Sequence, residues 1–228
     1  MIKILHRLSR KFKNKISKNN LGTVSKSYIS KFLDEEPIIV EAGAHVGTDT
    51  VEMAKRWPKG KIFAFEPIPE LYQRLVENLK GFGNVKCYKL ALSHKTGSSI
   101  MFVSSGFSDG SSSLLKPKEH LQIHPDVKFH KKIRIQTTNL DDWVEEQGIK
   151  RIDFLWLDIQ GSELDVLKNA GKILRKVKVV YTEVHLVENY KHGVLYSDLR
   201  KWMEAIGFKV DREEIAWDDG GNVLFVRA

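Results

Sequence analysis

Cysteine is almost absent from this chain, with Cys87 as its single thiol in 228 residues. One thiol can form neither an internal disulfide framework nor a thiolate metal cluster, and it suits a reducing compartment. The sequence also lacks a run of about 18 apolar residues, which a membrane-spanning helix requires, and the uninterrupted apolar core of a signal peptide. We therefore expect a cytoplasmic protein that neither spans a membrane nor is secreted.

An excess of basic residues is missing from most of the chain, although its net charge is +8. Residues 1–31 hold nine Lys and Arg and no acidic residue, while the remaining residues carry 28 basic and 29 acidic side chains. A duplex-binding protein needs basic residues distributed over a folded face. We therefore expect no specific nucleic-acid partner.

The N-terminal segment combines its positive charge with a helical pattern. Apolar residues recur at helical spacing and Lys or Arg fill the positions between them; the apolar residues are Leu5, Leu8, Phe12 and Ile16. Such a basic amphipathic helix can lie on an anionic membrane surface, and it can equally pack on its own domain or remain solvated. We predict a helical arm over residues 1–33, which would make the protein peripheral at a membrane if the arm binds there, and one folded domain over residues 34–228.

The body alternates apolar, β-branched runs with helical patterns. Strands are expected at 37–40, 61–65, 85–90, 152–157 and 177–184, and helices at 51–57, 69–79, 139–143, 164–167 and 198–206. This order predicts a doubly wound, Rossmann-like α/β fold with a mostly parallel sheet. Residues 208–210 and 223–226 are expected to close it as an antiparallel hairpin. Residues 100–103 and 133–137 predict extra strands around a long loop, 104–130, which is either a lid over the substrate or a disordered surface loop.

A glycine-rich turn follows the first predicted strand, with the sequence Glu-Ala-Gly-Ala-His-Val-Gly over residues 41–47. Ligands of open α/β sheets bind beyond the carboxyl ends of the strands, and glycines there permit close approach to the backbone. The dinucleotide fingerprint G-x-G-x-x-G is not met, because three residues separate Gly43 from Gly47. Glu41 would repel a diphosphate and suits a cationic ligand. Glu66 ends the second strand 25 residues later, where a carboxylate can accept hydrogen bonds from ribose hydroxyls.

These motifs, with others in the same order over residues 38–184, resemble the S-adenosylmethionine-dependent methyltransferases and specifically the FkbM family. The segments that carry the resemblance are 40–47, 64–67 (Ala-Phe-Glu-Pro), 90–93 (Leu-Ala-Leu-Ser), 112–114 (Ser-Ser-Leu), 138–142 and 152–163. The family commonly has Asp at the position of Glu41 and Glu at the position of Gln160.

The resemblance implies a seven-stranded class I methyltransferase sheet over residues 34–228, with S-adenosylmethionine as cofactor. It implies that the glycine turn lies against the methionine part of the cofactor, that Glu66 holds the ribose and that Ala91 and Leu92 line the adenine. The cofactor-binding residues expected on this basis are Glu41, Gly43, Ala44, His45, Gly47, Glu66, Pro67, Ala91, Leu92 and Asp158.

Methyl transfer requires alignment of donor and acceptor and, for an alcohol, removal of a proton. Asp158 ends the fourth strand, and Glu183 and His185 end the fifth, so the three side chains are expected to face one cleft. His185 is the leading general base because imidazole titrates near neutral pH. Alternatively, the three groups bind a divalent ion such as Mg²⁺ that acidifies the acceptor hydroxyl.

The acceptor atom is narrowed by two further absences. Residues 158–161 lack the Asn/Asp-Pro-Pro-aromatic turn of amine methylation on DNA bases, and Cys87 lies in a strand away from the cleft, so it cannot serve cytosine C5 methylation. O-methylation is therefore favoured, and by resemblance the acceptor is a hydroxyl of a sugar, glycolipid or natural product. The alternatives are a nucleotide-dependent oxidoreductase and a non-catalytic protein that binds membranes or anionic polymers through the basic arm.

Overall fold

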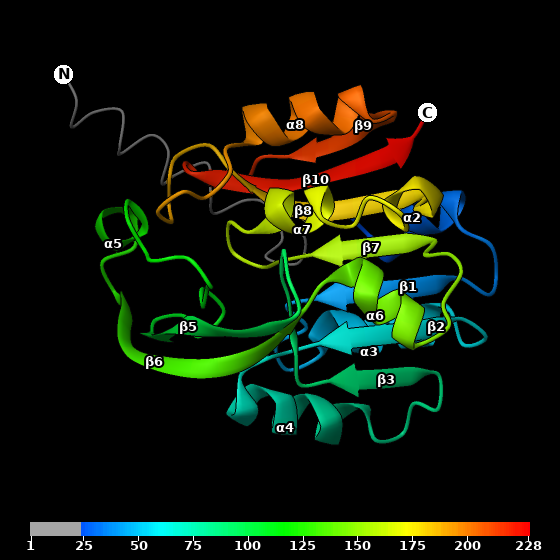
Figure 1. Cartoon of the computed structure of the whole chain (residues 1–228), viewed down its shortest axis with the longest axis horizontal. Helices are drawn as coiled ribbons and strands as arrows, with labels where there is room; N and C mark the ends of the chain where they lie inside the picture. Colours follow the sequence, from blue (N-terminus) through cyan, green and yellow to red (C-terminus); the bar gives the residue numbers. More distant parts are fainter. Residues whose placement is uncertain (1–23) are drawn as a thin grey trace, which may run out of the picture.

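A seven-stranded sheet forms the centre of the computed structural model, which describes residues 24–228 (Figure 1). Its strand order is β3-β2-β1-β7-β8-β10-β9. The strands are β1 Ile38–Ala42, β2 Lys61–Phe65, β3 Val85–Tyr88, β7 Phe154–Leu157, β8 Val179–His185, β9 Phe208–Glu214 and β10 Gly220–Arg227. The first five are parallel, and β10 is antiparallel to both of its neighbours. The predicted fold class, including the C-terminal hairpin, is confirmed.

Helices cover both faces of this sheet because its inner strands are apolar on both sides. In β1, Ile39 belongs to a buried cluster with Met53, whereas Val40 belongs to a separate cluster with Trp143. The helices are α2 Lys26–Ile29, α3 Thr48–Arg56 and α4 Pro69–Leu79 on one face, and α6 Leu140–Glu146, α7 Glu163–Lys168 and α8 Tyr196–Ala205 on the other. Short 3-10 turns lie at Ser30–Phe32 and Leu174–Lys176. This layering is the usual way to bury a parallel sheet.

A second, three-stranded sheet lies beyond the carboxyl edge of the parallel strands (Figure 1). It contains β4 Ala91–Leu92, β5 Gly97–Gly106 and β6 Val127–Thr138, in the order β4-β6-β5. Its apolar face, including Met101 and Ile135, packs with Ile68 and Leu71 at the start of α4. The small sheet therefore stands over the turns that follow β1 and β2.

The prediction of one long loop over residues 104–130 is wrong at both ends. The ends of that range belong to β5 and β6, and the helix α5 His120–Ile123 lies between them. The predicted loop was too long because the polar outer face of the β5–β6 ribbon has a composition similar to that of a loop. Residues 107–115, here called the roof segment, remain as the connection nearest to the parallel strand ends.

The beginning of the described chain packs on the body. The backbone N–H of Val24 donates to the Tyr181 hydroxyl at 3.0 Å, and Ile29 is fully buried in a cluster with Met53 and Trp57. Residues 24–33, which fall within the predicted arm, are thus attached to the sheet, while the rest of the arm lies outside the described residues. Among residues 24–228, none of the helices is long and apolar enough to cross a bilayer.

Candidate active site

A cavity of about 290 Å³ opens at the carboxyl ends of β1, β2 and β7. The small sheet and the roof segment close it from the other side. All the predicted cofactor-binding residues except Gly47 line it, namely Glu41, Gly43, Ala44, His45, Glu66, Pro67, Ala91, Leu92 and Asp158. Gly47 instead caps α3, with φ of 85°. Residues that are more than 100 positions apart in the sequence, such as Glu41 and Asp158, therefore meet in this cavity, as their places at strand ends predicted.

The glycine turn is held close to the neighbouring strand end. Gly43 has φ of 86°, and a Cβ at this position would lie 1.9 Å from the carbonyl oxygen of Asp158. The backbone N–H groups of Gly43 and Ala44 both donate to the carbonyl of Phe65, at 3.1 and 2.9 Å. Only glycine combines this backbone conformation with this contact. The turn thus presents bare backbone to the cavity.

Glu66 fastens the glycine turn to the start of α4. Its Oε2 accepts from the backbone N–H of His45 at 3.0 Å, and its Oε1 accepts from the N–H of Ile68 at 2.9 Å. The side chain is only 4% exposed, and this burial raises its pKa to about 7. Each carboxylate oxygen retains a further lone pair for a ligand hydroxyl.

Glu41 is a buried acid on the floor of the same cavity. Its Oε2 accepts from the Thr50 hydroxyl at 2.5 Å, and burial raises its pKa to about 8. The carboxyl group is therefore largely protonated at neutral pH. A cationic group bound in the cavity would favour the ionised form and would be stabilised by it.

Asp158 and Glu183 form a carboxyl pair at the ends of β7 and β8. Asp158 is exposed at the cavity wall, and desolvation by the protein around it raises the pKa of its carboxyl group. The pKa of Glu183 is raised well above its ordinary value by burial, by the charge of Asp158 and by a hydrogen bond with Asp158. A proton shared between the two carboxyl groups would relieve the repulsion between them. Glu183 itself does not line the cavity.

Gln160 connects this pair to the roof of the cavity. Its Nε2 donates to Asp158 Oδ1 at 2.8 Å and to the Glu183 carboxyl, and its Oε1 accepts from the Tyr190 hydroxyl at 2.8 Å. Its backbone carbonyl accepts from the Ser113 hydroxyl at 2.7 Å. Gln160 has φ of 56°, a conformation that a non-glycine residue adopts at a cost. Sequence reasoning missed this role, and the only signal for it was the position of Gln160 in a family motif.

His185 lies outside the cavity lining, unlike Asp158. It is 5% exposed, its ring nitrogen Nδ1 lies 3.2 Å from Asn189 Nδ2, and it packs beside Tyr190. Burial lowers its pKa to about 4, so it is neutral at pH 7 and a weaker base than a free histidine. Of the three residues predicted to face one cleft, Asp158, Glu183 and His185, only Asp158 lines the cavity. The catalytic role of His185 remains a prediction.

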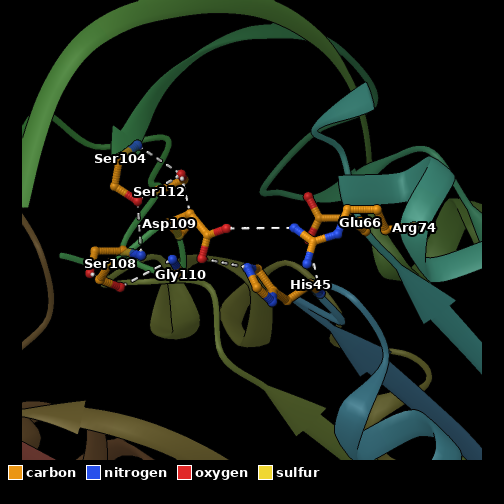
Figure 2. A network of polar contacts seen from close by, with 9 residues as sticks. His45, Glu66, Arg74, Ser104, Ser108, Asp109, Gly110 and Ser112 are labelled. Atoms are coloured by element: carbon orange, nitrogen blue, oxygen red, sulfur yellow. Dashed lines mark hydrogen bonds and ion pairs between the residues drawn. The ribbon is translucent and has the colours of Figure 1, made fainter. Parts of the chain in front are cut away.

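The roof segment is tied to the glycine turn by Asp109 (Figure 2). His45 Nε2 donates to Asp109 Oδ1 at 2.9 Å, and Arg74 from α4 lies 3.8 Å from Asp109 Oδ2. The roof segment is also joined to β5, because the Ser112 hydroxyl accepts from the backbone N–H of Ser104 at 2.9 Å. Asp109, Gly110, Ser112 and Leu114 all line the cavity, which sequence reasoning did not predict for Asp109 and Gly110. The serine-rich composition of this segment was the only signal that it contributes to the cavity.

The divalent-ion alternative gains no support from the arrangement of side chains. Within residues 24–228, no group of three or more His, Cys, Asp or Glu side chains is placed to hold a metal ion. The cavity instead combines two buried acids, Glu41 and Glu66, with an apolar wall that includes Phe65, Ala91 and Leu92. This is the chemistry expected for a nucleoside with a positively charged substituent.

Comparison with known proteins agrees with this geometry. The Methyltransferase FkbM domain matches residues 41–210. Among characterised proteins, the 2-O-methyltransferase NoeI of Sinorhizobium fredii is 32% identical over 173 residues, which is 74% of this chain and 71% of that protein. The hexuronic acid methyltransferase AglP of Haloferax volcanii is 26% identical over 67% of this chain and 57% of its own length.

A solved structure supports the fold. The methyltransferase FkbM from Methylobacillus flagellatus superposes with a TM-score of 0.53 and 16% identity, over 86% of this chain. This chain spans 45% of that larger protein. At this identity the likeness concerns the arrangement of helices and strands and extends no further.

Proposed function

The chain belongs to the FkbM family of S-adenosylmethionine-dependent methyltransferases, and we propose that it methylates a hydroxyl oxygen of a sugar or sugar-containing acceptor. The observation that carries the proposal is the cavity itself, where the glycine turn, two buried acids and an apolar wall meet the Asp158 carboxylate. The names of the relatives NoeI and AglP, a 2-O-methyltransferase and a hexuronic acid methyltransferase, support a sugar as acceptor. Glycolipids and other natural products with a free hydroxyl remain within the same class.

We propose the following residues for holding the cofactor. Glu66 would accept from the ribose hydroxyls, and Phe65, Ala91 and Leu92 would contact the adenine. Glu41 would face the positively charged amino acid part, next to the bare backbone of Gly43 and Ala44. When bound, S-adenosylmethionine supplies an electrophilic methyl group on a sulfonium.

We propose Asp158 as the group that accepts the proton of the acceptor hydroxyl, because it is the only one of the three predicted catalytic residues on the cavity wall. Glu183, hydrogen-bonded behind it, would stabilise whichever carboxyl group is ionised. His185 would take part only through groups between it and the cavity.

The decisive test measures cofactor binding and turnover separately. Glu66→Ala is expected to weaken S-adenosylmethionine binding at least tenfold in calorimetry, since about 1.5–3 kcal/mol is lost with each hydrogen bond to a charged group. Glu77→Ala, an exposed residue of α4, is the matched control and should bind like the wild type. Equal affinities for both variants would remove the ribose assignment.

Turnover is tested by release of S-adenosylhomocysteine with a panel of hydroxylated saccharides, with and without Mg²⁺. Methylation of at least one saccharide hydroxyl is expected, and Asp158→Asn should abolish it while retaining cofactor binding. Cofactor binding without turnover on any acceptor would undermine the O-methylation proposal. Tighter binding of NADH than of S-adenosylhomocysteine would instead revive the oxidoreductase alternative, which the family membership opposes.

A further inference from the structure

A second, basic groove lies on the outer face of the small sheet, between β5, β6 and α5. Its walls carry Lys116, Lys128, His130 and Lys132, and its apolar surface comes from residues that include Phe102 and Phe129. The four basic side chains are exposed, and the two phenylalanines are half-buried. Lys132 lies over the ring of Phe102, with Nζ 5.0 Å from its centroid. We call this feature the lysine groove.

The charge of the lysine groove is not neutralised by the described part of the chain. No Asp or Glu among residues 24–228 lines it, and Lys128 Nζ donates to the carbonyl of Pro125, at 2.6 Å. Neighbouring lysines are paired, since Lys118 binds Glu188 and Lys131 binds Glu70. Cations that no acid neutralises attract anions, and above an apolar surface they hold an anion more strongly than cations in open solvent do. The groove is therefore suited to an anionic ligand that also has an apolar face, as a sugar ring has.

The lysine groove shares a wall with the active-site cavity. Phe102 and Ser113 exchange two backbone hydrogen bonds, of 2.8 and 3.1 Å, which pair β5 with the roof segment. On β5, Met101 lines the cavity while the next residue, Phe102, lines the groove. On the connection after β5, Leu114 lines the cavity and Lys116 lines the groove. A chain-like ligand bound in the groove would therefore lie one strand away from the site of methyl transfer.

We propose that the lysine groove is an acceptor subsite that binds a negatively charged group, a carboxylate or a phosphate, on a saccharide acceptor. The inference rests on the proposed function and deepens it, because it assigns the acceptor to the anionic saccharides. A ring of the saccharide would lie on Phe102 or Phe129, with its anionic group near Lys116, Lys128 and Lys132. The hydroxyl to be methylated would belong to a neighbouring sugar that reaches the cavity.

The test uses trigalacturonic acid as carboxylate probe, glucose 1-phosphate as phosphate probe and maltotriose as neutral comparator, with binding measured by calorimetry in the presence of S-adenosylhomocysteine. At least one anionic probe should bind more tightly than maltotriose, and its affinity should fall as salt rises from about 50 to about 200 mM. K116Q/K132Q should weaken that binding at least about tenfold. The control K172Q/K201Q has the same loss of charge on exposed residues outside the groove and should bind like the wild type.

Cofactor affinity separates this inference from the proposed function. Both double variants should bind S-adenosylmethionine like the wild type and unfold at the same temperature, so a failure of methyl transfer leaves the groove test readable. Equal binding of the anionic probes by both double variants, or equal binding of maltotriose and the anionic probes, would overturn the proposal. It would also be overturned if K116Q/K132Q lost sedimentation with phosphatidylglycerol vesicles while no probe bound the wild type, since the groove would then serve a membrane.

Discussion

At the scale of single residues, the closest constraint in the site is the contact between Gly43 and Asp158. Gly43→Ala would place a Cβ against the Asp158 carbonyl, 1.9 Å away if nothing moved, at a φ of 86°. The backbone must therefore shift, and we expect a loss of about 2–4 kcal/mol in unfolding free energy together with weak cofactor binding. Denaturant unfolding and calorimetry measure the two effects.

Gly148→Ala is the control for backbone strain in this experiment. Gly148 has φ of 67°, but a Cβ added there would meet no atom of residues 24–228 within 4 Å, so alanine tests the conformation without the contact. We expect a cost of about 1 kcal/mol and unchanged cofactor affinity. Similar losses at both positions would show that the contact with Asp158 does not decide the requirement for glycine.

Gln160 provides the second prediction at this scale, as a positioning residue. Desolvation raises the pKa of Asp158, and the hydrogen bond donated by the Gln160 amide offsets part of that increase. Gln160→Leu removes the donor, so the pKa of Asp158 should rise and the acidic limb of the kcat profile should move to higher pH. We expect roughly tenfold lower kcat at pH 7 and little change in cofactor affinity. A lower kcat with an unmoved pH profile would indicate a purely structural role.

At the scale of secondary-structure elements, the roof segment is the part whose motion would control access. The His45–Asp109 hydrogen bond and the Asp109–Arg74 ion pair join it to the glycine turn and to α4, and all three side chains are partly exposed. Such contacts contribute about 0.2–1 kcal/mol each. Asp109→Ala should therefore speed release of S-adenosylhomocysteine by about three- to tenfold.

The release rate can be followed by stopped-flow fluorescence, because Trp156 lines the cavity. Asp126→Ala is a matched control, since Asp126 is an exposed acid at the base of the same connection between β5 and β6. If both variants released the product at the wild-type rate, the roof would not be held by Asp109.

The arrangement of the elements also explains which site residues could be predicted from the sequence. Glu41, Glu66 and Asp158 were predictable as neighbours because each lies at the carboxyl end of an apolar strand, and these ends of parallel strands meet at one edge. Asp109 was not predictable, because its place above the cavity depends on how the small sheet docks on α4. His185 ends β8 as predicted but does not line the cavity, because the strand pattern gives the edge of the sheet and not the direction of a side chain there.

At the scale of the whole molecule, the buried carboxyl groups at and beside the site lower the unfolding free energy of the protein at neutral pH. Burial raises the pKa of Glu163 to about 7, as it does for Glu66, although the ordinary value is 4.5. Between these values the folded protein keeps protons that the unfolded chain has released, so these two groups lower the unfolding free energy as pH rises from about 4.5 to about 7. His120 and His185 act in the opposite direction, because their pKa values are lowered to about 4 and stability is lost on acidification below 6.5.

Glu163→Gln isolates the first of these effects. Glu163 Oε1 accepts from the backbone N–H groups of Ile159 and Gly161, both at 3.2 Å, and the amide oxygen of glutamine can replace it. The variant should gain up to about 3 kcal/mol over the wild type at pH 8 and little at pH 5, measured by urea unfolding without cofactor. Glu77→Gln, on the exposed face of α4, should show no such pH dependence. If the gain for Glu163→Gln were the same at both pH values, Glu163 would titrate normally in the folded protein, and the site would not carry this cost.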